Sequence, residues 1–156
     1  MNEKNKIERL RCLMKNNNIN YYYVPHEDEH LTEYVSENRE RLQWISGFSG
    51  SAGSFLIGLK NTYLFVDGRY SLQAKHQMSG IKCKILNIKE NNFIHFLQTN
   101  INRNDTISFD NKLITHKSFN LISEACILRS IKVVIPKKNL IDLIWNRCKK
   151  TQNSKK

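Results

Sequence analysis

The sequence has 156 residues, of which 40% are hydrophobic, and carries a formal net charge of +11. A chain of this length forms one ordinary domain, which buries about 68–70% of the surface that the unfolded chain exposes. No apolar run approaches the roughly 20 residues needed to span a bilayer, and Met1-Asn2-Glu3-Lys4 leads into a charged segment rather than an apolar signal core. We therefore expect a cytoplasmic domain that makes no membrane contact.

The positive charge could indicate a nucleic-acid partner. Lysine and arginine are spread along the whole chain, however, apart from Lys149-Lys150 and Lys155-Lys156 near the end. No segment interleaves aromatic and basic residues in the way that single-strand-binding surfaces do. A compositional bias toward lysine at solvated positions explains the charge better, so a basic nucleic-acid binder is kept only as a minor alternative.

The four cysteines, Cys12, Cys83, Cys126 and Cys148, are scattered without a close pair. This spacing fits neither a zinc ribbon nor a disulfide framework, and it predicts reduced thiols. Cys12, Cys83 and Cys126 occur in apolar patterns, so we expect them to be small residues of the core.

Hydrophobic periodicity predicts helices and strands that alternate along much of the chain. Ile7, Leu10, Leu13 and Met14 recur at helical spacing near the N-terminus, whereas three consecutive tyrosines lie in a strand-like run that stops at Pro25. In chain order the expected elements are a helix at 4–16, a strand at 19–24, a helix at 39–45, strands at 54–59 and 63–66, a helix at 69–78, a strand at 83–88, a helix at 93–101, a strand at 106–109, a helix at 116–128, a strand at 131–135 and a last helix around 140–145.

The order of these elements predicts the fold class. The strands at 54–59 and 63–66 are joined by Lys60-Asn61-Thr62 and predict a hairpin, after which helices and strands alternate. This pattern is typical of an α/β fold with a mixed β-sheet flanked by helices. No internal repeat or linker divides the chain, so we expect a single domain over residues 3–148, followed by a polar tail over 149–156.

A turn rich in glycine and serine lies between the helix at 39–45 and the strand at 54–59, and it contains Gly47, Gly50 and Gly53. Glycines at such positions allow a positive φ or a close approach of another part of the chain. The turn lacks the Gly-Lys-Ser/Thr ending of a phosphate-binding P-loop. We therefore predict a tightly packed corner between a helix and a strand rather than a phosphate site.

A second motif, Asp67-Gly68-Arg69-Tyr70, follows the strand at 63–66. Asp67 is a suitable N-cap because its carboxylate can accept hydrogen bonds from the amides of the next turn, and we expect a helix to begin at Arg69. Judged on these residues alone, Arg69 is a surface arginine that makes a local salt bridge.

The segment His26-Glu27-Asp28-Glu29-His30 matches the H-E-x-x-H pattern of zinc proteases. That site needs both histidines on one helical face, a glutamate base and a third ligand. Three fixed letters are weak evidence, and a run of acidic residues is also typical of a solvated loop. We predict no metal site in this chain and keep the zinc-protease interpretation as a trailing alternative.

Three segments together resemble a known family. WISGFSGSAG at 44–53 and DGRYSLQA at 67–74, with VPHEDEHLTEY at 24–34 upstream, closely resemble the N-terminal domain of Xaa-Pro aminopeptidases (aminopeptidase P) of the creatinase/prolidase type. Leu140–Trp145 is similar to the helix that ends this domain, so the resemblance runs from about Arg9 to Trp145. The chain departs from the family pattern at His26, near Glu37 and at Leu42, which loosens the substrate-side loop without threatening the fold.

The resemblance implies roles for several residues. In the three-domain enzymes the arginine of the DGRY motif reaches the substrate, which makes Arg69 a candidate substrate-binding residue. His30 and Tyr34 match the family pattern and would organise the loop beside the substrate channel, with weaker support. The residues expected to build the structural motif are Gly47, Gly50, Gly53, Asp67 and Gly68.

The resemblance also implies what this chain lacks. Catalysis in the family belongs to a C-terminal pita-bread domain, in which two aspartates, a histidine and two glutamates hold two divalent metals, usually manganese. We expect none of these ligands here, and hence an inactive chain that needs the catalytic domain in cis or in trans, as a truncated product or half of a split enzyme. A proline-containing peptide is the implied substrate, and a homodimer is possible in the full enzyme. A stand-alone peptide- or protein-binding module that has lost the peptidase is the main alternative.

Overall fold

The computed structural model describes residues 1–27, 35 and 39–146. Six strands in this part of the chain form one sheet with the order β4-β3-β2-β1-β5-β6. The strands are β1 (Tyr21–Pro25), β2 (Ser54–Gly58), β3 (Thr62–Val66), β4 (Cys83–Asn87), β5 (Thr106–Phe109) and β6 (Lys132–Val134). The helices are α1 (Glu3–Asn16), α2 (Arg41–Ser46), α3 (Ser71–Gln77), α4 (Phe93–Thr99), α5 (His116–Leu128) and α6 (Leu140–Ile144), with 3₁₀ turns η2 (Gly68–Tyr70) and η3 (Asn111–Leu113).

The direction of the strands decides where the connecting loops meet. β2 pairs antiparallel with both β1 and β3, while β1 with β5, β5 with β6 and β3 with β4 are parallel pairs. Among the described strands, β2 alone therefore opposes the others. The C-terminal ends of the other five strands all lie at the same edge of the sheet, which we call the carboxyl edge. These strands are β1, β3, β4, β5 and β6. The expected α/β fold with a mixed sheet is confirmed.

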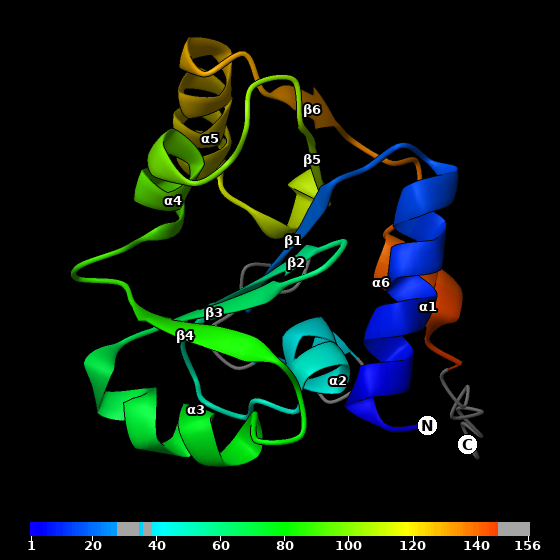
Figure 1. Cartoon of the computed structure of the whole chain (residues 1–156), viewed down its shortest axis with the longest axis vertical. Helices are drawn as coiled ribbons and strands as arrows, with labels where there is room; N and C mark the ends of the chain where they lie inside the picture. Colours follow the sequence, from blue (N-terminus) through cyan, green and yellow to red (C-terminus); the bar gives the residue numbers. More distant parts are fainter. Residues whose placement is uncertain (28–34, 36–38, 147–156) are drawn as a thin grey trace, which may run out of the picture.

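Helices cover both faces of the sheet (Figure 1), with α4 and α5 on one face and α1, α2 and α6 on the other. Alternate residues of β3 point to opposite faces, so Leu64 and Val66 join the core under α1 and α2, and Phe65 joins the core under α4 and α5. Ala74 and Met78 bring α3 to the first of these cores. The inner strands β2, β3 and β5 are thus buried on both faces, as their apolar residues require.

The predicted helices and strands are all present, and most differences lie at their ends; in addition, one predicted helix is divided and the 3₁₀ turn η3 was not predicted. The strand at 106–109 and the helix at 116–128 have the predicted bounds. Pro25 belongs to β1, where it pairs with Ser54 at the end of the strand. The predicted helix at 69–78 is divided into η2 and α3, because Asp67 caps a tight 3₁₀ turn that begins at Gly68.

The prediction for the cysteines was wrong for one of them. Cys12 is exposed on α1, Cys83 is half-buried and Cys126 is buried. Cys12 lies on the solvent side because the buried stripe of α1 is formed by Ile7, Leu10 and Met14, and position 12 is not three or four residues from 7, 10 or 14 on that stripe. Burial raises the pKa of both the Cys83 and the Cys126 thiols to about 11.

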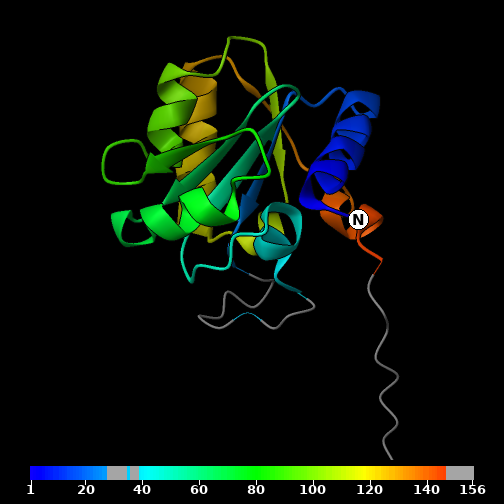
Figure 2. The ribbon, with the colours of Figure 1, turned by 60° about the horizontal axis from the view of Figure 1, so that its bottom comes forward.

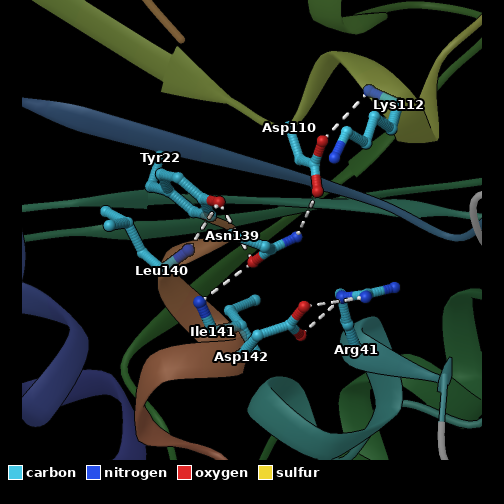
Figure 3. A network of polar contacts seen from close by, with 8 residues as sticks. All are labelled: Tyr22, Arg41, Asp110, Lys112, Asn139, Leu140, Ile141 and Asp142. Atoms are coloured by element: carbon cyan, nitrogen blue, oxygen red, sulfur yellow. Dashed lines mark hydrogen bonds and ion pairs between the residues drawn. The ribbon is translucent and has the colours of Figure 1, made fainter. Parts of the chain in front are cut away.

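A polar network fastens α6 to the sheet and to α2 (Figure 3). The Tyr22 hydroxyl donates to Asn139 Oδ1 at 3.1 Å and accepts from the Leu140 amide at 3.2 Å. Asn139 Nδ2 donates to Asp110 Oδ2 at 3.2 Å. Because Tyr22 is buried, its pKa lies well above the usual value. The network satisfies polar groups that would otherwise be costly to bury.

An ion pair extends this network to α2. Arg41, whose side chain is only 3% exposed, donates from Nε to Asp142 Oδ1 at 2.8 Å and from Nη2 to Asp142 Oδ2 at 3.0 Å. One turn further along each helix, Trp44 stacks on Trp145 with ring centroids 5.2 Å apart. The two short helices α2 and α6 are therefore held together by charge and by aromatic packing.

Replacing Asp142 by alanine should lower the free energy of unfolding by about 1.5–3 kcal/mol. The buried Arg41 guanidinium would lose both of these acceptors, and removing one partner of a buried pair is destabilising. Urea denaturation followed by circular dichroism measures the effect. Glu90→Ala, at an exposed position, is the control and should change stability by less than about 0.5 kcal/mol. Equal losses of unfolding free energy in the two variants would show that the Arg41–Asp142 ion pair does not stabilise the fold.

Candidate functional site

The glycine-rich turn begins where α2 ends. Gly47 has a φ of +79°, and its amide donates to Gln43 O at 2.8 Å. This left-handed conformation ends the helix and is strained for residues with a Cβ. The Ser46 hydroxyl donates to Leu42 O at 2.5 Å and accepts from the Phe48 amide at 3.0 Å, so the first residues of the turn are fixed to the helix end.

The ring of Phe48 occupies the space beneath the turn. Phe48 is 1% exposed, and a Cβ added at Gly50 would lie 2.8 Å from Phe48 Cε1. At Gly53, with a φ of +155°, an added Cβ would lie 3.1 Å from Phe65 O and 3.2 Å from Phe48 Cε1. These contacts support the predicted tightly packed corner, since only glycine leaves room for the ring at Gly50.

The second motif lies at the same carboxyl edge of the sheet, directly after β3. Asp67 Oδ1 accepts from the Arg69 amide at 3.0 Å and from Arg69 Nε at 3.2 Å. These contacts, with the Arg69 amide as the largest cause, hold the pKa of Asp67 below its usual value. The Arg69 side chain is 77% exposed, and its guanidinium carbon lies 5.6 Å from the centre of the Tyr70 ring.

The structure brings the two motifs into contact, although about 20 residues separate them in the sequence. The Ser51 and Tyr70 hydroxyls lie 2.6 Å apart. The Ser49 hydroxyl accepts from Gln77 Nε2 at 2.7 Å and from Gln73 Nε2 at 3.1 Å. Figure 2 shows α2 and α3 next to each other at one end of the sheet, and these hydrogen bonds join the turn after α2 to α3.

Sequence reasoning had not assigned a role to the residues of this contact. Ser49, Ser51, Gln73 and Gln77 are small or amide side chains without a charge signal. Ser49, Ser51 and Gln73 lie inside the two quoted motifs, which was the only indication available, and Gln77 lies three residues beyond the second motif. Of the residues predicted to build the structural motif, Gly50 and Gly53 face the Phe48 ring, while Gly47 lies beside Glu3 and Gly68 beside Asn87. Asp67 caps the turn that carries Arg69.

A shallow hollow opens next to the glycine turn. Its lining residues are His26, Val35, Glu40, Leu42, Gln43, Phe48, Ser49, Gly50 and Ser51. His26 thus lies near the turn, while His30 and Tyr34, which were the weaker substrate-binding candidates beside Arg69, lie outside the described residues. The described chain contains no group of three or more histidine, cysteine, aspartate or glutamate side chains that could hold a metal ion. The H-E-x-x-H interpretation gains no third ligand from these residues.

Replacing Gly50 by alanine should lower the free energy of unfolding by about 1–3 kcal/mol, because the added methyl group overlaps the buried Phe48 ring. Gly80→Ala is a matched control, since an added Cβ there would meet no heavy atom within 4 Å. Thermal and urea denaturation of both variants measures the difference. Equal stability of the two variants would show that the ring adapts without cost.

Comparison with known proteins places the chain in a family. A family model for the creatinase/prolidase N-terminal domain matches residues 6–143. The chain is 35% identical over 144 residues to a probable Xaa-Pro aminopeptidase P of Coprinopsis cinerea, and 35% identical over 144 residues to Xaa-Pro aminopeptidase 1 of Dictyostelium discoideum. The alignments cover 90% and 89% of this chain but 23% of each relative, so the chain spans less than a quarter of their length.

No described helix is long and apolar enough to cross a membrane.

Solved structures show the same relationship. X-prolyl aminopeptidase from Caenorhabditis elegans, described as a cytosolic enzyme with a di-nuclear active site, superposes with a TM-score of 0.86 at 25% identity, over 93% of this chain and 26% of that chain. The N-terminal domain of the cytoplasmic peptidase PepQ from Mycobacterium tuberculosis shares the fold, with a TM-score of 0.65 at 16% identity over 90% of this chain and 98% of that chain. The chain belongs to the creatinase/prolidase N-terminal domain family.

Proposed function

We propose that this chain is the non-catalytic N-terminal domain of a cytosolic Xaa-Pro aminopeptidase, and that its carboxyl edge forms part of the substrate channel. The parent reaction is the metal-dependent release of the N-terminal residue from peptides with proline in second position. The catalytic domain, joined in cis or supplied in trans, is the partner, and the full enzyme can be a homodimer.

The observation that carries this proposal is the exposed Arg69 at the carboxyl edge. In open α/β sheets, ligands bind beyond the carboxyl ends of the strands, which is where β3 ends and Arg69 follows. Arg69 Nε donates to Asp67, so the two terminal amino groups of the Arg69 guanidinium can donate hydrogen bonds to peptide carbonyls or a carboxylate in a planar geometry. Arg69 therefore fits a rim residue that binds the part of a peptide extending beyond proline.

Metal chemistry belongs to the partner domain in this proposal. Two divalent metals would generate the attacking hydroxide and stabilise the charge on the scissile carbonyl. The described residues provide no ligand set for such a pair. This chain contributes binding and positioning of the peptide rather than a step of the reaction.

The purified chain should bind neither manganese nor zinc in stoichiometric amount and should show no peptidase activity, because a two-metal site needs several convergent carboxylates and a histidine. Metal analysis after dialysis, together with an assay on Xaa-Pro peptides, provides the measurement. Tight zinc binding that is lost in His26→Ala or His30→Ala would revive the zinc-protease interpretation and overturn this prediction.

When the chain is combined with the catalytic part of a Xaa-Pro aminopeptidase, Arg69→Ala should lower kcat/KM about tenfold on peptides that extend beyond proline, a loss of ~1.4 kcal/mol. Dipeptides should be affected much less, because they do not reach the rim. Steady-state kinetics on a peptide series of increasing length measures the difference.

Arg103→Ala is the matched control for this experiment. Arg103 is also exposed, but it precedes β5 and so lies at the opposite end of the strands from Arg69. This variant should leave kcat/KM unchanged on all peptides. If Arg69→Ala also leaves kcat/KM unchanged on long and short peptides alike, Arg69 is only a surface residue and the proposed substrate contact is wrong.

A further inference from the structure

We infer that Tyr70 and Ser51 are positioning residues for Arg69, and that their hydroxyl contact locks the glycine-rich turn to the turn that carries the arginine. The inference rests on the proposed function, because it concerns how the rim arginine is held for a peptide. Neither hydroxyl is assigned any contact with the substrate.

Tyr70 lies between the core and the exposed arginine. Its ring meets the buried Phe48 ring edge to face, with centroids 6.3 Å apart and planes at 85°. The Arg69 guanidinium carbon lies 5.6 Å from the centre of the same Tyr70 ring, within the range of a cation–π contact. A shift of the Tyr70 ring therefore changes the support of the guanidinium directly.

The hydroxyl of Tyr70 fixes where this ring lies. Its contact with the Ser51 hydroxyl, at 2.6 Å, joins it to the glycine-rich turn. The turn is itself held on both sides, since the Ser49 amide donates to Gln77 Oε1 at 3.0 Å and the Phe48 amide donates to the Ser46 hydroxyl at 3.0 Å. Ser51 thus offers Tyr70 an anchor in a turn that is hydrogen-bonded to the end of α2 and to Gln77 of α3.

An anchor of this kind matters because Arg69 is so exposed. A long side chain that is 77% exposed loses rotamer freedom when it binds a peptide, and that loss weakens binding. Asp67 restrains the guanidinium at Nε, and the Tyr70 ring restrains its face. Together they present the arginine in fewer conformations before a peptide arrives, which is the physical content of preorganisation.

The first test uses the chain by itself. In ¹⁵N relaxation measurements on arginine Nε–Hε groups, the heteronuclear NOE of Arg69 should fall in Tyr70→Phe and in Ser51→Ala, since either change removes the hydroxyl contact but keeps the core. Tyr63→Phe is the matched control, because the Tyr63 ring packs on Phe96 on the opposite face of the sheet. It should leave the Arg69 signal unchanged.

The second test uses the chain combined with its catalytic partner. Tyr70→Phe should raise KM for long peptides about threefold while leaving kcat and the KM of dipeptides unchanged, a pattern that a general loss of stability would not produce. Ser51→Ala should have the same effect, and the double variant should be no worse than either single one. In an Arg69→Ala background, Tyr70→Phe should have no further effect.

The outcomes separate this inference from the proposed function. If Tyr70→Phe matches Tyr63→Phe in both the Arg69 relaxation and the KM of long peptides, the positioning role is wrong. An equal rise in KM with and without Arg69 also overturns it, because the tyrosine would then act by another route. If Arg69→Ala has no kinetic effect but Tyr70→Phe loosens Arg69, the proposed substrate contact fails while the positioning of Arg69 stands.

Discussion

The carboxyl edge of this domain depends on the absence of side chains at Gly50 and Gly53. The ring of Phe48 lies where a Cβ of Gly50 would be, and through that ring the glycine-rich turn rests on the core. Tyr70, which directly precedes α3, packs against the same Phe48 ring. The buried ring of Phe48 therefore supports both the glycine-rich turn and Tyr70, the residue next to Arg69. The position of the exposed Arg69 thus depends on a contact in the core.

Contacts of α2 and α6 elsewhere in the fold fix the helix that leads into the glycine-rich turn. The Arg41–Asp142 ion pair and the Trp44–Trp145 stack fasten α2 to α6, and the Tyr22 hydroxyl fastens the start of α6 to the sheet. These groups come from segments more than 90 residues apart, as the contact of Tyr22 with Asn139 illustrates. The helix that leads into the glycine-rich turn is thereby fixed at its beginning, while Gly47 fixes its end.

Much of the fold could be predicted because local patterns and tertiary packing agree. Thr106–Phe109 and His116–Leu128 have the predicted bounds. Polar and apolar residues alternate in the strand, and apolar residues recur at helical spacing in the helix, which Thr115 caps, so both elements are specified locally. Cys12 was predicted wrongly, because an apolar neighbourhood in the sequence does not say which side of a helix faces the core. The direction of β2 was implied by the hairpin, but the order of the strands in the sheet was not.

The sequence by itself determined the family, the alternation of helices and strands, and the glycine and aspartate positions that shape the two turns, because these depend on side-chain type and local backbone freedom. Only the tertiary structure decided that the two motifs touch. The contacts of Ser51 with Tyr70 and of Ser49 with Gln73 and Gln77 arise because β2 and β3 form a hairpin whose open end brings residue 53 beside residue 66. Hydrogen bonds between uncharged side chains leave no periodic signal in a sequence, so their pairing follows from strand direction and packing.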